Sequence, residues 1–121
     1  MGKPANILRK QIITYLERSG WFVESRPTGL FKSLVGSRLI RVAPKGALDL
    51  IGCTPEGRYF EIEVKAGDDR LSKEQKARIE RLHGFGALAI EARGLGDVAR
   101  LVEQNAKVAQ RMLWYHSDLK T

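Results

Sequence analysis

The order of the expected elements predicts an α/β fold with a mixed central sheet flanked by helices. An amphipathic helix opens the chain, short apolar strands follow, and two further helices lie on either side of a last apolar strand. Strands that alternate with helices in this way form a sheet that is covered on both faces. A length of 121 residues fits a single domain over residues 1–121, with a hydrophobic core of its own.

The first part of the chain is expected to form a helix and then extended segments. Apolar side chains recur at helical spacing over residues 5–19, and Gly20 ends that pattern. Asn6 is a candidate N-cap for this helix. The next expected elements are a strand over residues 21–26, a mixed loop over residues 30–36, and a second strand or extended arm over residues 38–42.

A hairpin is predicted between Gly46 and Lys65. Two apolar-rich runs flank the turn Pro55-Glu56-Gly57, where proline presets φ and glycine supplies a positive φ. In the second run, the period of two puts Glu61, Glu63 and Lys65 on one face. The first run carries Asp49 among apolar neighbours, so pairing of the two strands would bring Asp49 and Glu63 together.

The last part of the chain is expected to form a helix, a strand and a helix. Ser72 precedes a helical pattern that continues to residue 83. Residues 85–91 form a short apolar run, typical of a buried parallel strand. Asp97 is expected to cap a final helix whose apolar stripe serves either as core or as an oligomer seam.

The paired carboxylates predict a divalent metal site. Two like charges held close together repel, and one of them protonates unless a cation compensates them. Mg²⁺ and Mn²⁺ prefer carboxylate, backbone carbonyl and water ligands. Lys65, two residues after Glu63, is placed to act on a water molecule or to stabilise charge on a phosphate. An Asp followed by Glu-x-Lys on a neighbouring strand is typical of metal-dependent phosphodiester hydrolysis.

These residues resemble the PD-(D/E)xK nuclease superfamily and, more closely, its VRR-NUC family of virus-type replication-repair nucleases. The resemblance is carried by Gly46-x-x-Asp49, Glu63-Val64-Lys65 and Leu71-Ser72-x-x-Gln75. It implies a restriction-endonuclease-like αβββαβ core and DNA endonuclease activity. It also implies that Asp49, Glu63 and the Val64 carbonyl hold Mg²⁺ or Mn²⁺, and that Lys65 and Gln75 complete the catalytic set.

Two positions leave alternatives open. The resemblance has Gln75 pointing to the metal site, whereas the pattern Ser72-Lys73-Glu74-Gln75 also predicts a capping box at the helix terminus. The first helix of this family usually carries a Glu, and that position falls near Arg9 here. Because Arg9 cannot bind a metal, the number of metal ions, one or two, stays open.

The composition favours a nucleic-acid partner and an intracellular location. A net charge of +7 and a pI near 9.9 attract polyanions, and no apolar run is long enough to span a membrane. One cysteine, Cys53, predicts a reducing, cytoplasmic compartment. The candidate DNA-binding residues are Arg38, Arg41, Lys45 and Lys73.

We therefore expect a metal-dependent DNA endonuclease that prefers branched DNA, four-way junctions first, and that acts as a homodimer. Its dimer contact would come from Phe31, Leu34 and Val35 or from Leu113, Trp114 and Tyr115. The alternatives are a repair nuclease that cuts flaps or forks and a catalytically inactive basic nucleic-acid-binding module. A further alternative is a structural adaptor in which Glu61, Glu63 and Lys65 form only a surface ladder of cross-strand pairs.

Overall fold

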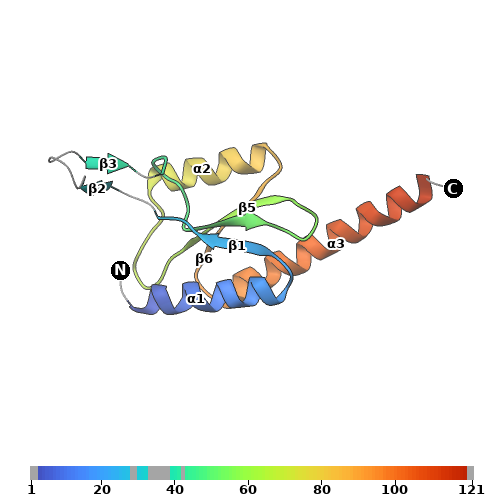
Figure 1. Ribbon diagram of the computed structural model, residues 1–121, viewed down its shortest axis with the longest axis horizontal. Helices are drawn as coiled ribbons and strands as arrows, with labels where there is room; N and C mark the ends of the chain where they lie inside the picture. Colours follow the sequence, from blue (N-terminus) through green and yellow to red (C-terminus); the bar gives the residue numbers. More distant parts are fainter. Residues whose placement is uncertain (1–2, 28–29, 33–38, 42, 120–121) are drawn as a thin grey trace.

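The computed structural model has a four-stranded sheet with helices on both of its faces (Figure 1). It describes residues 3–27, 30–32, 39–41 and 43–119, with side chains over residues 4–27 and 43–111. The sheet has the order β1-β4-β5-β6, in which β1, β4 and β5 pair antiparallel and β6 is parallel to β5. Its strands are β1 (Phe22–Ser25), β4 (Leu50–Cys53), β5 (Tyr59–Val64) and β6 (Leu88–Ala92).

The described residues also form three helices. They are α1 (Lys3–Arg18), α2 (Lys73–Gly84) and α3 (Leu95–Leu119). In chain order, α1, β1, β4, β5, α2 and β6 form the expected αβββαβ core, and α3 follows it. This confirms the predicted fold class, including the parallel placement of the last strand.

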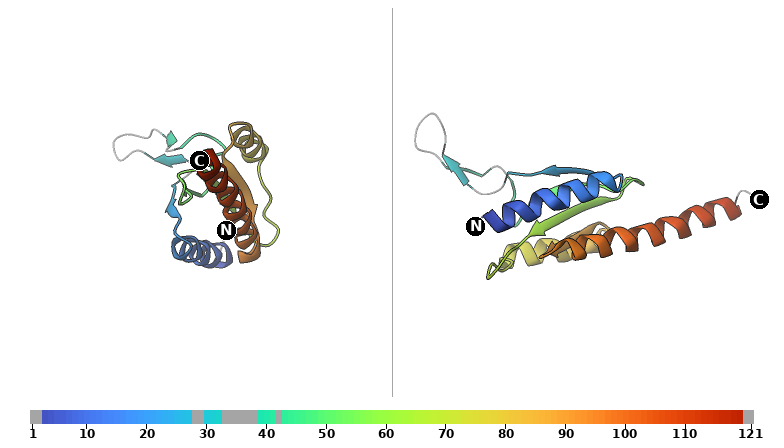
Figure 2. Two further views of the ribbon diagram at one scale, coloured as in Figure 1. Left: turned by 90° about the vertical axis from the view of Figure 1, so that its right-hand side faces the viewer. Right: turned by 90° about the horizontal axis from the view of Figure 1, so that it is seen from below.

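The hydrophobic core lies between the sheet and the pair α1 and α3, which cover the same face (Figures 1 and 2). Helix α2 covers the other face and has no buried residue of its own. The rings of Trp21 and Phe60 meet edge to face in the core at 5.2 Å. The other buried members are Ile12, Leu16, Val23, Leu50, Ile62, Val64, Ala92, Val98 and Leu101.

A short ribbon of two strands lies apart from the central sheet (Figure 1). It pairs β2 (Leu30–Lys32) with β3 (Leu39–Arg41) in an antiparallel register. The expectation of a loop was therefore wrong at residues 30–32, because strand 39–41 provides a partner for their backbone. Of the residues predicted here, Leu34, Val35 and Arg38 lie outside the described residues, and Phe31 and Arg41 are described only as backbone.

Two helix starts differ from the sequence-based expectation. Helix α1 begins at Lys3, so Asn6 lies inside it and is not its N-cap. Helix α3 begins at Leu95, and Asp97 sits in its first turn, where its Oδ2 accepts bonds from the N–H groups of Arg93 and Gly94. The apolar stripe of α3 is core at Val98 and Leu101. Leu113, Trp114 and Tyr115 lie on α3 beyond its described side chains.

Candidate active site

The register of the β4–β5 hairpin brings the two predicted metal ligands together. Leu50 pairs with Ile62, so the next step along both strands sets Asp49 opposite Glu63. The Asp49 N–H donates to Glu63 Oε1 at 3.1 Å, and the Val64 N–H donates to Asp49 Oδ2 at 3.1 Å. Each carboxylate is thus held by the backbone of the opposite strand. The sequence-based placement of Asp49 beside Glu63 agrees with this geometry.

The backbone conformation and surroundings of Gly46 explain why the motif before Asp49 begins with glycine. Its φ is +88°, and a Cβ at this position would lie 2.6 Å from the Glu74 carbonyl oxygen in the first turn of α2. Only glycine accepts both the positive φ and this close approach of two backbones. The segment that leads into Asp49 can therefore lie directly against α2 because Gly46 has no side chain.

Glu63 is held in an unfavourable electrostatic setting. Its side chain is only 6% exposed. Burial raises the pKa of Glu63, and the nearby charge of Asp49 raises it further. Lys65, whose Nζ lies 3.3 Å from Glu63 Oε2, opposes this shift without cancelling it. A cation shared by Asp49 and Glu63 would remove the conflict, so these residues fit a divalent metal ion in their charge and ligand type.

Arg9 on α1 also belongs to the site. The sequence excluded Arg9 as a metal ligand, but its contact with Asp49 was not predicted. Its Nη2 lies 3.2 Å from Asp49 Oδ2, and its Nη1 donates to Asn6 Oδ1 at 2.6 Å. The spacing of Asn6 and Arg9 by one helical turn was a signal for the bond between these two residues, but not for the contact of Arg9 with Asp49. Among the residues that the structure describes, no three His, Cys, Asp or Glu side chains are grouped to hold a metal.

Gln75 takes the capping position that the sequence offered as an alternative. Its N–H donates to Ser72 Oγ at 3.0 Å, and its side-chain Oε1 accepts the Ser72 N–H at 2.9 Å. Both bonds of the capping box are therefore formed. The structure thus ties the Gln75 oxygen to the terminus of α2 and does not direct it to Asp49 or Glu63. A catalytic role for Gln75 stays a prediction.

A second buried carboxylate on β5 was missed as a structural centre. Glu61 is fully buried, and both of its oxygens accept bonds from Arg78 on α2 at 2.7 Å. Arg26 donates to Glu61 Oε2 at 2.7 Å and the Tyr59 hydroxyl donates to the same atom at 2.5 Å. Burial alone would raise the pKa of Glu61, but the bonds from Arg78, Tyr59 and Arg26 outweigh it and lower the pKa to about 2.

The burial of Glu61 and Glu63 contradicts the structural-adaptor alternative. That alternative needs a ladder of exposed charges along β5, whereas Glu61 is 0% and Glu63 is 5% exposed. Helix α2 covers the face on which these side chains lie, and Arg78 reaches from it to Glu61. Carboxylates buried in this way are paired inside the protein and do not form a solvated surface ladder.

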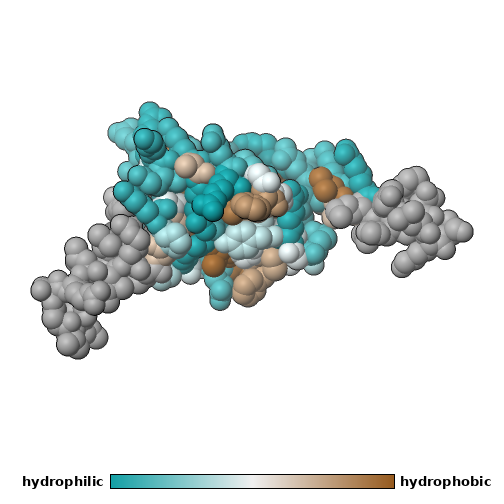
Figure 3. All heavy atoms as spheres, turned by 90° about the horizontal axis from the view of Figure 1, so that it is seen from above, coloured by the Kyte–Doolittle hydropathy of each residue, from teal (hydrophilic) through white to brown (hydrophobic). Residues whose placement is uncertain are grey.

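Two of the four candidate DNA-binding residues lie near the first turn of α2. Lys45 is exposed and its Nζ lies 3.3 Å from Glu74 Oε2, and Lys73 is the exposed first residue of the helix. The surface seen from the α2 side is largely hydrophilic (Figure 3). A hollow of about 280 Å³ beside Lys45 is also lined by Arg78 and Arg81. Arg38 and the Arg41 side chain lie outside what the structure describes.

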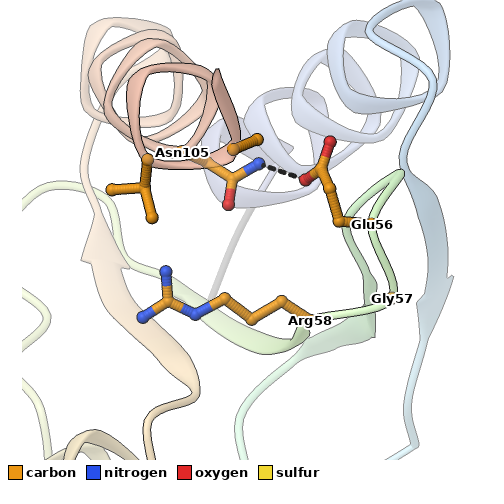
Figure 4. Close-up of a pocket in the computed structure, with 6 residues that line it drawn as sticks. Glu56, Gly57, Arg58 and Asn105 are labelled. Atoms are coloured by element: carbon orange, nitrogen blue, oxygen red, sulfur yellow. Dashed lines mark hydrogen bonds between the residues drawn. The ribbon is translucent and has the colours of Figure 1, made fainter. Parts of the chain in front are cut away.

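A larger cavity, of about 410 Å³, lies at the other end of the β4–β5 hairpin (Figure 4). It is bounded by the hairpin turn and by α3, where Asn105 Nδ2 donates to Glu56 Oε1 at 2.9 Å. Gly57, Arg58, Val108 and Ala109 complete its lining. None of the predicted catalytic or metal-binding residues lines this cavity, so the carboxylate pair is the better candidate for an active site.

The αβββαβ core has the arrangement of restriction-endonuclease-like domains. Residues 16–95, more than half of the chain, match the VRR-NUC domain family. The chain therefore belongs to the VRR-NUC family, as its motifs predicted.

The structural comparison supports the same fold. A solved structure described as a VRR_NUC domain superposes with a TM-score of 0.60 and 21% sequence identity. The match covers 84% of this chain and 97% of that one. No curated protein matches the chain.

Within the described residues, no helix combines the length and apolar character needed to cross a bilayer.

Proposed function

We propose that this protein is a metal-dependent DNA endonuclease whose active site is built on Asp49, Glu63 and Lys65. The observation that carries the proposal is the interlocked pair at the end of the β4–β5 hairpin. There, Glu63 accepts the Asp49 N–H, and Lys65 lies against the second Glu63 oxygen. The fold keeps two acidic groups close together, and the raised pKa of Glu63 reflects the electrostatic cost of doing so. A cation bound between them would offset that cost.

Asp49, Glu63 and the backbone carbonyl of Val64 would hold Mg²⁺ or Mn²⁺. Such an ion polarises a phosphoryl oxygen and lowers the pKa of water. The chain itself contributes the position of the two carboxylates, which the cross-strand hydrogen bonds fix. Lys65 has a side chain only 16% exposed, and its ammonium would act on the attacking water or on the phosphate. Gln75 would join them only after leaving its capping box.

We further propose branched DNA as the substrate, four-way junctions first, and a homodimer as the acting form. Paired cuts in strands of like polarity follow from C₂ symmetry when each subunit carries one site. The net charge of +7 supports binding to a polyanion. Light scattering at micromolar concentration should then give about twice the chain mass of 13.6 kDa.

Two other functions remain to be separated from this one. A monomer that cuts flaps or forks and leaves four-way junctions intact would favour the repair-nuclease alternative. A catalytically inactive DNA-binding module is favoured by one observation, the ion pair by which Arg9 already neutralises Asp49. A panel of labelled four-way, forked, flapped and linear DNAs, incubated with Mg²⁺ and with Mn²⁺, distinguishes all three.

The decisive variant is Lys65→Ala, with Lys76→Ala on the exposed surface of α2 as a control of equal charge change. We expect Lys65→Ala to abolish most cleavage and to leave DNA affinity nearly unchanged, because one lysine is a small part of the basic surface. For both variants and the wild type, affinity should fall steeply with salt, since phosphate binding releases counterions. Cleavage at the wild-type rate by Lys65→Ala would remove Lys65 from the reaction.

A further inference from the structure

Each carboxylate of the candidate site has a cation of its own. Lys65 lies against Glu63 and comes from the same strand. Arg9 lies against Asp49 and comes from α1, forty positions away in the chain. The Arg9 guanidinium is held from two sides, because Asn6, one turn earlier on α1, accepts a bond from its other terminal nitrogen. This contact is therefore specific and bridges two elements of the fold.

The Arg9–Asp49 contact and a metal at Asp49 disfavour each other electrostatically. An ion bound by the two carboxylates would place a double positive charge beside the guanidinium, which stays charged at all relevant pH values. In the metal-free site, by contrast, Arg9 offsets the repulsion between Asp49 and Glu63. Arg9 therefore stabilises the empty site and competes with whatever cation enters it.

A displaced Arg9 would have a partner in the substrate. Its side chain is 25% exposed, so it can leave Asp49 without unfolding its surroundings. A guanidinium binds phosphate with charge-assisted, often bidentate hydrogen bonds. A phosphodiester that approaches the carboxylate pair would bring such a group to the same place.

We propose that Arg9 is the counter-ion of Asp49 in the metal-free site and a phosphate-binding residue in the metal-loaded site. The inference rests on the proposed metal site at Asp49 and Glu63. Arg9 thus couples the two binding events, because a metal at Asp49 releases the group that holds the DNA. By reciprocity, DNA bound to Arg9 frees Asp49 for the metal.

The first test measures Mn²⁺ binding by calorimetry in the absence of DNA. Arg9→Gln should bind Mn²⁺ roughly tenfold or more tightly than the wild type, because a positive charge next to the ligand is removed. Lys10→Gln, an exposed neighbour on the same helix, removes the same charge away from Asp49 and should leave the affinity nearly unchanged. Arg9→Lys keeps the charge and should stay near the wild type.

The second test measures affinity for a four-way junction in a Lys65→Ala background, which limits cleavage. Without metal, Arg9→Gln and Lys10→Gln should weaken binding equally, because Arg9 is engaged with Asp49. With Mn²⁺, Arg9→Gln should weaken binding by about tenfold more than Lys10→Gln, as expected for loss of a hydrogen bond to a charged group.

The outcomes separate this inference from the proposed function. Equal Mn²⁺ affinity in Arg9→Gln and Lys10→Gln, with binding that Asp49→Ala abolishes, would overturn the role of Arg9 and leave the metal site intact. An Arg9→Gln penalty on DNA binding that is the same with and without Mn²⁺ would overturn the phosphate role. If no variant binds Mn²⁺, the proposed metal site fails and the inference fails with it.

Discussion

Replacing Glu61 by glutamine should destabilise the fold strongly, although the side chain keeps its shape. The buried carboxylate accepts bonds from Arg78, Arg26 and the Tyr59 hydroxyl. An amide is neutral, and its NH₂ group would face donors. The two guanidinium groups would keep their charge and lose their only buried carboxylate in this cluster.

The magnitude follows from the pKa of Glu61. Its pKa falls from 4.5 to about 2, because the hydrogen bonds from Arg78, Tyr59 and Arg26 outweigh the effect of burial. A difference of about 2.5 pKa units corresponds to roughly 3 kcal/mol in favour of the charged form in the fold. Because the folded-state pKa is the lower one, this stability is present above pH 4.5 and is lost as the pH falls toward 2.

Urea unfolding measures this effect directly. At pH 7 we expect Glu61→Gln to lose roughly 3 kcal/mol of unfolding free energy, while Glu80→Gln on the exposed side of α2 should change it by less than about 0.5 kcal/mol. The difference between Glu61→Gln and the wild type should shrink as the pH is lowered through 4.5 toward 2. A loss below about 1 kcal/mol at pH 7, or a loss independent of pH, would refute the reasoning.

Two further substitutions test the site itself. Gly46→Ala should cost at least about 3 kcal/mol and abolish cleavage, whereas Gly57→Ala, at φ +90° in open space, should cost only about 1–2 kcal/mol in urea unfolding. Equal losses would show that the approach of Glu74 to Gly46 is not limiting. Glu63→Gln should leave metal-free stability at pH 7 equal to or above the wild type and abolish Mn²⁺ binding in calorimetry, because the raised pKa of Glu63 means that the fold favours its neutral form. A strongly destabilised Glu63→Gln would show that the Lys65 ion pair outweighs the repulsion from Asp49.

The pairing of Asp49 with Glu63 could be read from the sequence because local rules fix it. The turn around Gly57, which has a φ of +90°, sets the register, and the period of two decides which face each side chain takes. The capping box at Ser72 is equally local, since both of its partners lie within three residues. In such cases the chain determines the contact without help from distant elements.

Contacts between distant elements could not be predicted in the same way. Glu61 meets Arg26 and Arg78, which lie 35 and 17 positions away, and nothing in its own strand indicates that α2 covers it. The contact of Arg9 with Asp49 depends on how α1 packs against the sheet. Strand β2 has only three residues and depends on β3 for its backbone bonds. The contacts of Glu61 and Arg9 need the packing of the whole domain, whereas β2 needs only its partner strand β3.

The contrast between Glu61 and Glu63 shows how one strand can carry a structural and a reactive carboxylate. Both side chains lie on the same face of β5, and both are nearly inaccessible to solvent. Arg78 and Arg26 neutralise Glu61 and lower its pKa, whereas Glu63 is buried beside Asp49, and Lys65 and the Asp49 N–H only partly oppose the rise in its pKa. A cation would gain little at Glu61, because the two guanidinium groups already neutralise this carboxylate and would repel a further positive charge. At Glu63 it would gain two carboxylates whose repulsion Lys65 and Arg9 offset only in part. The position of Arg78 on α2 therefore decides which of the two residues is available for chemistry.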